Sequence, residues 1–264
     1  MSIPSGDTVS HPQMLTLALD TTTVAGSLAL ARDDRLLEAT TGTPDRTHGE
    51  RLPGELVALL SRHDATLREV ERFVVAAGPG SFTGLRVGIA TAQGLALTLG
   101  RPVIAIPVFD ALVEIARRRT TGGAVAPAAI VPWMDGARRE VFSAIYAPAT
   151  ERASAAAVPA WRLEVGPVAE RPLPLLERWG ARLGGRLVWF IGDAVIEHQA
   201  SLLAAAGPGS RILADLPVLA GTLAVMASRP PWRDGPATPH ALRPIYVRRS
   251  DAEIARDRRR KARG

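Results

Sequence analysis

The chain opens with short apolar runs separated by polar breaks. Such runs predict strands, and three of them close together in sequence favour an antiparallel meander. The three strands are expected at residues 14–20, 26–31 and 36–40. Leucines then recur every three or four residues, which predicts an amphipathic helix from Gly49 to His63 with Pro53 in its first turn.

Strands and helices alternate in the rest of the chain. Thr66 and Glu69 fit a capping box that opens a short helix. A strand over residues 73–77 runs into the glycine-rich segment Gly78–Gly84 and then into a long helix that ends near Leu99. Further strands are expected at residues 103–106, 129–134, 141–146, 187–191 and 211–213, and further helices at residues 109–118, 173–183, 194–206 and 216–228.

This order of elements predicts two lobes. Strands followed by helix–strand alternation occur twice, which favours an α/β protein whose lobes each contain a mixed β-sheet flanked by helices. Residues 120–127, rich in Gly, Ala and Thr, are expected to form a hinge. The expected divisions are a disordered extension at 1–13, a first lobe at 14–119, a second lobe at 120–228, a C-terminal segment at 229–249 that returns to the first lobe, and a basic tail at 250–264.

The composition excludes several kinds of chemistry. The 264 residues include no cysteine, which excludes disulfides, a thiol nucleophile and cysteine-ligated metal centres. Lys261 is the only lysine, so the chain has no P-loop lysine. Residues 248–263 hold eight basic and three acidic residues, so most of the net charge of +6 belongs to the tail and the body is near neutral.

The apolar stretches do not predict a membrane protein. None reaches the roughly 18 uninterrupted apolar residues that a membrane-spanning helix requires. Residues 1–13 lack the basic and apolar regions of a signal peptide. We therefore expect a cytoplasmic protein with no membrane partner.

Two segments of the first lobe are candidates for facing a ligand. Asp20 precedes three threonines, a group that can hold a hydrated metal or a phosphate; the alternative is a plain turn whose side chains bond their own backbone. Gly78–Gly84 precedes a helix whose free N–H groups favour an anion; the alternative is a tight strand-to-helix turn. The weak candidates for phosphate or nucleotide binding are Asp20, Thr21, Gly78, Gly80 and Ser81.

Small residues lie four apart on the long helix, at Gly84, Gly88, Ala92 and Ala96. Such a ridge allows another helix to pack at close range, and the other sides of this helix are also apolar. The helix is therefore expected to be buried on more than one side. Its neighbours are its own sheet and either a second helix of the chain or another protein.

The histidines do not form a recognisable metal site. No two of them stand four residues apart, so no metal ligand is assigned among His11, His48, His63, His198 and His240. No Ser-His-Asp set is present and no catalytic residue is assigned. His48 follows Thr47 at a helix start, where a solvated capping role is expected. The basic residues of 256–263 fit either contacts with RNA phosphates or a disordered solubilising tail.

Five motifs resemble those of the TsaB (YeaZ) family. The match is dense over residues 15–147 and thin over 148–240. The motifs are Leu17–Thr23 with Gly26–Leu30, Arg46–His48 with Leu52-Pro53, Gly78–Ala96, Asp135–Phe142 and Pro244–Arg248. The resemblance implies the two-lobed actin-like ATPase fold (ASKHA, RNase H-like) of the Gcp-like, or glycoprotease, group.

The resemblance also implies a function in making threonylcarbamoyladenosine at position 37 of tRNA. In that family the protein is a non-catalytic subunit that dimerises with the catalytic paralogue TsaD, and the ATPase TsaE joins the pair. The resemblance implies that the chain forms a homodimer when TsaD is absent, and that it contacts tRNA through the complex or through its basic tail. It also implies that the chain binds no cofactor tightly and that ATP or ADP lies at the interface of the complex. The implied partner interface comprises His48, Leu52, Leu56, Gly84, Gly88, Ala92 and Ala96.

Two absences agree with a non-catalytic subunit. The catalytic paralogue needs a His-x-x-x-His metal pair, which this chain lacks, and the region expected to form an adenosine loop, Phe190–Ala194, offers one glycine. Two alternatives stay open. One is a metal- or nucleotide-dependent acyltransferase, peptidase or kinase that acts alone through Asp20 and Gly78–Gly84, and the other is an independent RNA-binding protein.

Overall fold

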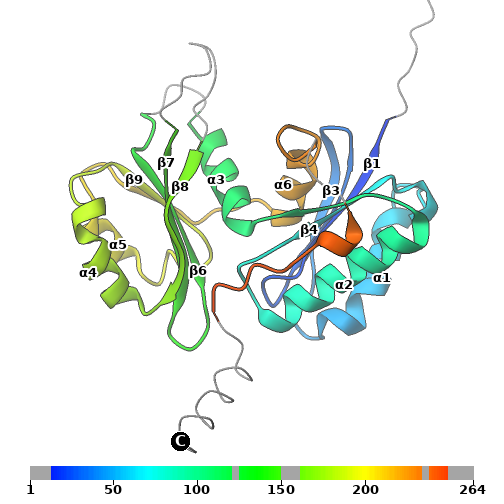
Figure 1. Cartoon of the computed structure of the whole chain (residues 1–264), viewed down its shortest axis with the longest axis horizontal. Coiled ribbons are helices and arrows are strands. Elements are labelled where there is room, and N and C mark those ends of the chain that lie inside the picture. Colours follow the sequence, from blue (N-terminus) through cyan, green and yellow to red (C-terminus); the bar gives the residue numbers. More distant parts are fainter. Residues whose placement is uncertain (1–12, 121–124, 150–160, 234–237, 249–264) are drawn as a thin grey trace, which may run out of the picture.

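The computed structural model describes residues 13–120, 125–149, 161–233 and 238–248. These residues form two five-stranded sheets, each with helices on its outer face, and two further helices lie between the sheets (Figure 1). The expected basic tail at 250–264, and the extension at 1–13 except for Gln13, lie outside the described residues. In the part of the chain that the structure describes, no helix is both long and apolar enough to cross a membrane.

The first sheet has the strand order β3-β2-β1-β4-β5. The first three strands form the expected antiparallel meander, and β4 and β5 run parallel to β1. Leu17 and Leu19 point to one face of the sheet and Ala18 to the other, because side chains alternate along a strand. The strands are β1 (Leu15–Asp20), β2 (Ser27–Arg32), β3 (Arg35–Thr41), β4 (Arg72–Ala76) and β5 (Val103–Ile106).

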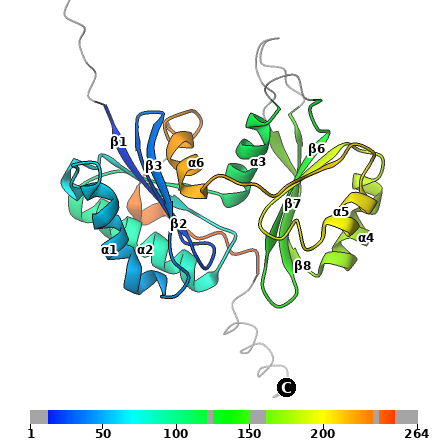
Figure 2. The same cartoon turned by 180° about the vertical axis from the view of Figure 1, so that it is seen from behind.

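Helices α1 (His48–Ser61) and α2 (Phe82–Leu99) cover the outer face of this sheet (Figure 2). The leucines of α1 that recur every three or four residues are buried against the sheet, as the periodicity predicts. The Thr66–Glu69 capping box is also present, since the Thr66 N–H donates to the Glu69 carboxylate over 2.8 Å. The element that it opens is a single 3-10 turn, Leu67–Glu69.

The second sheet has the strand order β10-β9-β6-β7-β8. Its strands are β6 (Ala129–Asp135), β7 (Val141–Pro148), β8 (Trp161–Glu170), β9 (Val188–Ile191) and β10 (Arg211–Leu213). Strand β8 was not expected, because it is an edge strand with many half-exposed and charged positions and no apolar run. Helices α4 (Pro172–Leu183) and α5 (Gln199–Ala205) cover the outer face, and α5 is shorter than expected because residues 193–198 form turns.

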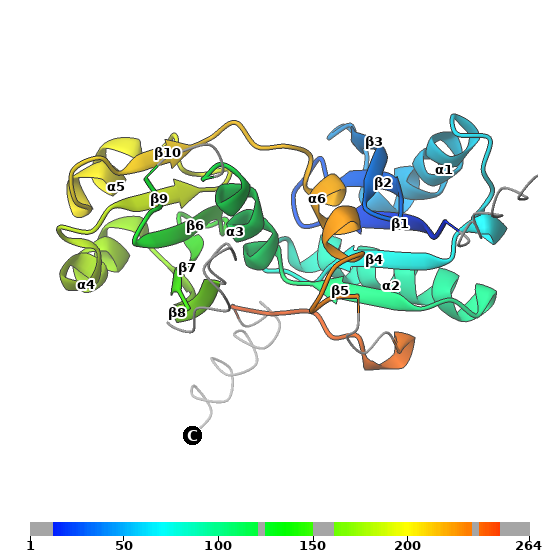
Figure 3. The same ribbon diagram turned by 90° about the horizontal axis from the view of Figure 1, so that it is seen from above.

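Helices α3 (Val108–Arg118) and α6 (Leu219–Met226) lie between the two sheets (Figure 3). Helix α3 packs on β6, β9 and α6. Helix α6 packs on β1 to β4, although the expected division at residue 228 assigned it to the second lobe. The reason is its composition: every residue of α6 is apolar or small except Thr222, so the helix can be covered on several sides. This is the predicted two-lobed actin-like arrangement.

The C-terminal segment contacts both lobes. The Gln93 side chain donates to the carbonyl oxygen of Pro239 over 2.8 Å, and the Ile245 N–H donates to the carbonyl oxygen of Ala77 over 2.7 Å. Arg248 then reaches the hairpin of the second lobe, where it donates to the Gly136 carbonyl oxygen over 2.8 Å. The segment therefore crosses from α2 to the β6–β7 hairpin, as Figure 1 shows.

Candidate functional site

Asp20 lies at the end of β1 and is almost fully buried. One carboxylate oxygen accepts hydrogen bonds from the Thr22 N–H over 2.9 Å and the Thr22 hydroxyl over 2.6 Å, and the other accepts from the Ser27 hydroxyl over 3.2 Å. Burial raises the pKa of Asp20, and these hydrogen bonds oppose the rise. The carboxylate is thus engaged by its own turn, which is the plain-turn alternative given by the sequence.

Glycines let the segment after β4 pack closely against this turn. A Cβ atom at Gly80 would overlap Thr22, and one at Gly84 or Gly88 would overlap Thr21. The Ser81 N–H donates to the Thr22 carbonyl oxygen over 2.8 Å, which fixes the contact.

Other residues of the segment Gly78–Gly84 are also held by contacts within the chain. Gly78 has a φ of +102°, which favours glycine, and a Cβ atom there would lie 2.8 Å from the carbonyl oxygen of Ile245. The Ser81 side chain caps α2 by accepting from the Gly84 N–H over 3.2 Å. All five candidate phosphate-binding residues therefore make contacts within the chain, and only Gly80 and Ser81 among them line the cleft described below.

The small-residue ridge of α2 faces inward. Ala92 and Ala96 lie in the core between α2 and the sheet, and Leu52 and Leu56 of α1 share that core. Each of these four side chains is at most 3% exposed, and Gly84 and Gly88 contact the β1–β2 turn. The expectation that these six residues touch a partner protein therefore fails, because the chain itself covers them. The ridge serves close packing on the chain's own sheet and turn.

His48, the seventh expected interface residue, is half-buried and bonded rather than solvated. The Arg51 guanidinium donates to its Nδ1 over 2.8 Å, so Nε2 carries the proton and donates to the Thr23 carbonyl oxygen over 2.9 Å. Arg51 itself is buried, pairs with Glu55 over 2.8 Å and donates to the carbonyl oxygens of Val24 and Ala25. This network ties the start of α1 to the β1–β2 turn.

The outward sides of α1 and α2 carry small and apolar residues. Val57 is 56% exposed and Leu97 is 49% exposed. Gly54 and Gly94 lie on the same outward sides, and a Cβ atom at either would meet nothing within 4 Å. We call seven exposed small or apolar positions of the two adjacent helices the α1–α2 outer face; its residues are Pro53, Gly54, Val57, Ala58, Ala90, Gly94 and Leu97.

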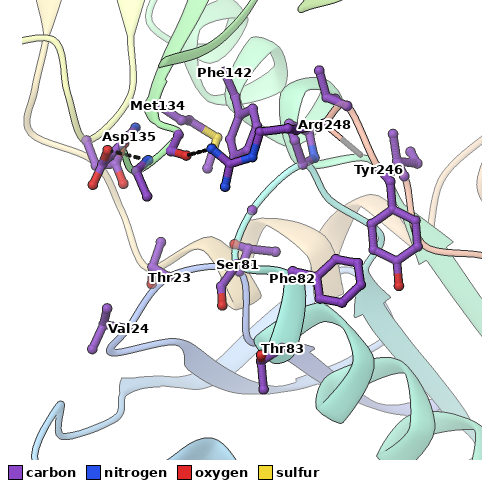
Figure 4. A pocket seen from close by; sticks show the side chains of 18 of the residues that line it. Thr23, Val24, Ser81, Phe82, Thr83, Met134, Asp135, Phe142, Tyr246 and Arg248 are labelled. Carbon is purple, nitrogen blue, oxygen red and sulfur yellow. Dashed lines mark hydrogen bonds between the residues drawn. The ribbon is translucent and has the colours of Figure 1, made fainter. Parts of the chain in front are cut away.

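A cleft of about 660 Å³ separates the two lobes. The β1–β2 turn and the start of α2 form one wall, and the β6–β7 hairpin, Asp193 and the C-terminal segment form the rest (Figure 4). Its second-lobe wall is held by hydrogen bonds, since Arg248 bonds Glu140 over 3.0 Å and the Asp135 N–H donates to the Asp193 carboxylate over 2.9 Å. Burial raises the pKa of Asp193, and the nearby charge of Asp135 raises it further.

An arginine–aromatic group that was not predicted from the sequence lies at one side of this cleft. The Arg86 guanidinium lies 4.0 Å from the centre of the Phe82 ring and its Nε donates to the Tyr246 hydroxyl over 3.0 Å. The Phe82 and Tyr246 rings are 4.9 Å apart (Figure 4). Because Tyr246 lies 160 residues from Arg86, only the fold brings them together.

The cleft has little that would perform chemistry. Among the described residues, no group of three or more His, Asp or Glu side chains could hold a metal ion. The two acids that line it, Asp135 and Asp193, each accept a hydrogen bond from a backbone N–H of the chain. The contacts around the cleft hold its walls together, and they leave few reactive side chains free to act on a ligand.

Comparisons with known proteins agree with the motifs. Residues 42–162 match the model of the family described as TsaD, tRNA N6-adenosine threonylcarbamoyltransferase. The chain is 30% identical to the Bacillus subtilis tRNA threonylcarbamoyladenosine biosynthesis protein TsaB over 133 residues, 50% of this chain but only 55% of that protein. It is 30% identical to an uncharacterised Mycobacterium tuberculosis protein over 90% of this chain and 93% of that protein. The solved structure of YeaZ from Pseudomonas aeruginosa superposes with a TM-score of 0.62 at 24% identity, covering 88% of this chain and 99% of that one.

Proposed function

Because the chain belongs to the TsaB (YeaZ) family, we propose that it is a non-catalytic subunit of the machinery that makes threonylcarbamoyladenosine at position 37 of tRNA. The observation that carries the proposal is the inward engagement of Asp20, Thr21 and Gly78, three of the five residues expected to bind phosphate. Asp20 is held by Thr22 and Ser27, and the glycine-rich segment is packed on the same turn. A subunit of this kind supports a catalytic partner and does not itself transfer the threonylcarbamoyl group.

The partner in this proposal is a TsaD-type catalytic paralogue, and its docking site is the α1–α2 outer face. Exposed Val57 and Leu97 supply apolar area, while the open positions at Gly54 and Gly94 let a helix of the partner approach closely. A second copy of this chain would use the same face when the paralogue is absent. A TsaE-type ATPase would join the pair, and the complex would act in the cytoplasm.

Ligands and tRNA would reach this subunit through the complex. No cofactor would bind it tightly alone, and ATP or ADP would lie at the interface with its partners. The body of the chain is near neutral, so tRNA would be held mainly by the partners. Contact through the basic tail at 250–264 is also compatible with the proposal.

Calorimetry with the TsaD-type paralogue of the same organism tests this function. The double variant Val57→Arg, Leu97→Arg places two charges on the α1–α2 outer face and should weaken binding at least about a hundredfold, a cost of roughly 3 kcal/mol. Leu173→Arg is the matched control, because Leu173 is equally apolar and 62% exposed but lies on α4. Both variants should melt like the wild type. Full affinity of the double variant would refute the docking site, and no binding by the wild type would refute the proposed function.

A further inference from the structure

A second cavity of about 790 Å³ lies on the other side of the C-terminal segment from the interlobe cleft. Pro79 and Ile245 line both spaces and separate them. Helix α3, strands β7 and β8, and the residues that follow α6 form its walls. Its size is within the range of sites that hold small organic molecules or single side chains with their backbone.

The walls of this cavity are apolar and aromatic. Trp161 begins β8, Trp232 follows α6 and Tyr146 lies on β7, so three separate segments contribute rings. Both tryptophans are half-buried, and Tyr146 is buried. Faces of tryptophan and tyrosine attract organic cations as well as apolar groups.

Three of the four charged side chains that line the cavity have ion-pair partners among the described residues. Glu114 accepts from Arg117 over 2.5 Å and from Arg118 over 2.8 Å, and Arg229 pairs with Asp34 over 3.5 Å. Asp110 is different, because no basic side chain of the described residues lies within ion-pair distance of it.

The surroundings of Asp110 leave one oxygen open to a ligand. The Tyr146 hydroxyl donates to Oδ1 over 2.7 Å, and no described residue bonds Oδ2. Burial raises the pKa of Asp110, which is the expected consequence of a carboxylate that lacks a cation in an apolar site. Burial, and after it the charge of Asp110, raise the pKa of Tyr146, so the phenol stays protonated and keeps donating.

We propose that this cavity binds an organic cation, an ammonium or guanidinium group on an apolar body, with the charge against Asp110 and the body against Trp161 and Trp232. The cation pairs with the one lining carboxylate that has no ion-pair partner among the described residues, and the rings stabilise both parts of the ligand. The same chemistry is offered by a free amine or guanidine and by an arginine side chain of another protein.

A titration with n-butylguanidinium, followed by the indole N–H resonances of Trp161 and Trp232, tests the site. The neutral isostere n-butylurea is the matched probe. We expect saturable shifts with n-butylguanidinium and at least tenfold weaker binding of n-butylurea. Equal binding of the two probes would overturn the proposal. A glycine–serine octapeptide with one central arginine forms a second arm: tighter binding of the peptide identifies a protein side chain as the ligand, and tighter binding of the free guanidinium identifies a small molecule.

Substitutions then test whether Asp110 holds the positive charge of the ligand. Asp110→Asn keeps the acceptor for Tyr146 and should bind n-butylguanidinium at least tenfold more weakly, whereas Glu177→Gln, an exposed acid on α4, should leave binding unchanged. If Asp110→Asn fails to fold, Trp161→Ala and Trp232→Ala replace it, and each should weaken binding at least threefold. Wild-type affinity in Asp110→Asn, or in both tryptophan variants, would overturn the proposal.

Discussion

The Thr21 hydroxyl donates a 2.8 Å hydrogen bond to the carbonyl oxygen of Gly84, and both groups are buried. This bond joins the turn after the first strand to the first turn of α2, two segments that are 63 residues apart. Since Gly88 also contacts Thr21, two successive turns of α2 are fixed to the β1–β2 turn. The small residues of α2 therefore determine the shape of the first lobe and of one wall of the interlobe cleft.

Because the small-residue ridge of α2 faces the core, Ala92→Arg should strongly destabilise the protein. Ala92 is fully buried, so the substitution overfills the core and buries an unpaired charge, at a cost of more than about 3 kcal/mol in the free energy of unfolding. Ala90→Arg is the control, because Ala90 is exposed on the same helix and its substitution should change stability by less than about 0.5 kcal/mol. Thermal unfolding of the two variants checks this, and an Ala92→Arg protein that melts like the wild type would show that the ridge is not in the core.

A pair of glycine variants separates close packing from helix propensity. Gly84→Ala adds a methyl group against the Thr21 carbonyl oxygen and should destabilise the protein by about 1–3 kcal/mol. Gly94→Ala adds the same group where nothing lies within 4 Å, so the better helix former should stabilise by about 0.5–1 kcal/mol. Urea denaturation measures both changes. Equal effects of the two variants would contradict the packing described for Thr21.

The pH dependence of stability should report the burial of Asp20. Its pKa in the folded protein is raised above the ordinary 3.8, so the folded protein holds the proton to a higher pH than the unfolded chain. The stabilisation from this proton is full below the ordinary pKa and is lost as the pH rises through the folded-state pKa. The free energy of unfolding of the wild type minus that of Asp20→Asn should therefore fall as the pH rises above the ordinary pKa of 3.8. A difference that rises over this range would indicate a lowered pKa and an unburied carboxylate.

Nucleotide should have little effect on the isolated chain. Asp20, Thr21 and the glycine-rich segment are engaged by one another, so MgATP finds few free groups in the cleft. A micromolar dissociation constant would add about 4 kcal/mol to the free energy of unfolding at millimolar ATP. We expect no measurable rise in the melting temperature at that concentration. A rise of several degrees would require a nucleotide site that these contacts do not leave open.

The sequence predicted most elements of the fold because their signals are local. The capping box at Thr66, the leucine period of α1 and the meander of β1 to β3 depend only on neighbours in the chain. Strand β8 was not predicted, because an edge strand needs no continuous apolar run. Helix α6 was assigned to the other lobe because a uniformly apolar helix does not indicate which sheet it will contact.

The sequence predicted less of the site, since the direction of a small-residue ridge is a tertiary property. The small-residue pattern of α2 correctly predicted close packing. Gly84 and Ala92, however, contact the chain's own turn and core and not a partner protein. Val57 and Leu97, on the opposite sides of their helices, are the large apolar residues that α1 and α2 expose. Arg86 and Tyr246 gave no sequence signal because they meet only when the C-terminal segment returns past α2.

Reconstituted tRNA modification in vitro tests the non-catalytic role proposed for this chain. Threonylcarbamoyladenosine at position 37 would be measured after incubating tRNA with the threonylcarbamoyl adenylate donor, the TsaD-type and TsaE-type proteins, and this chain, with each protein omitted in turn. We expect that this chain alone forms no product and that omitting it reduces product at least about tenfold, a loss of roughly 1.4 kcal/mol in effective stabilisation of the active complex. The double variant Val57→Arg, Leu97→Arg should have the same effect as omission. Product formed by this chain alone, or undiminished product in its absence, would show that the proposed role is wrong.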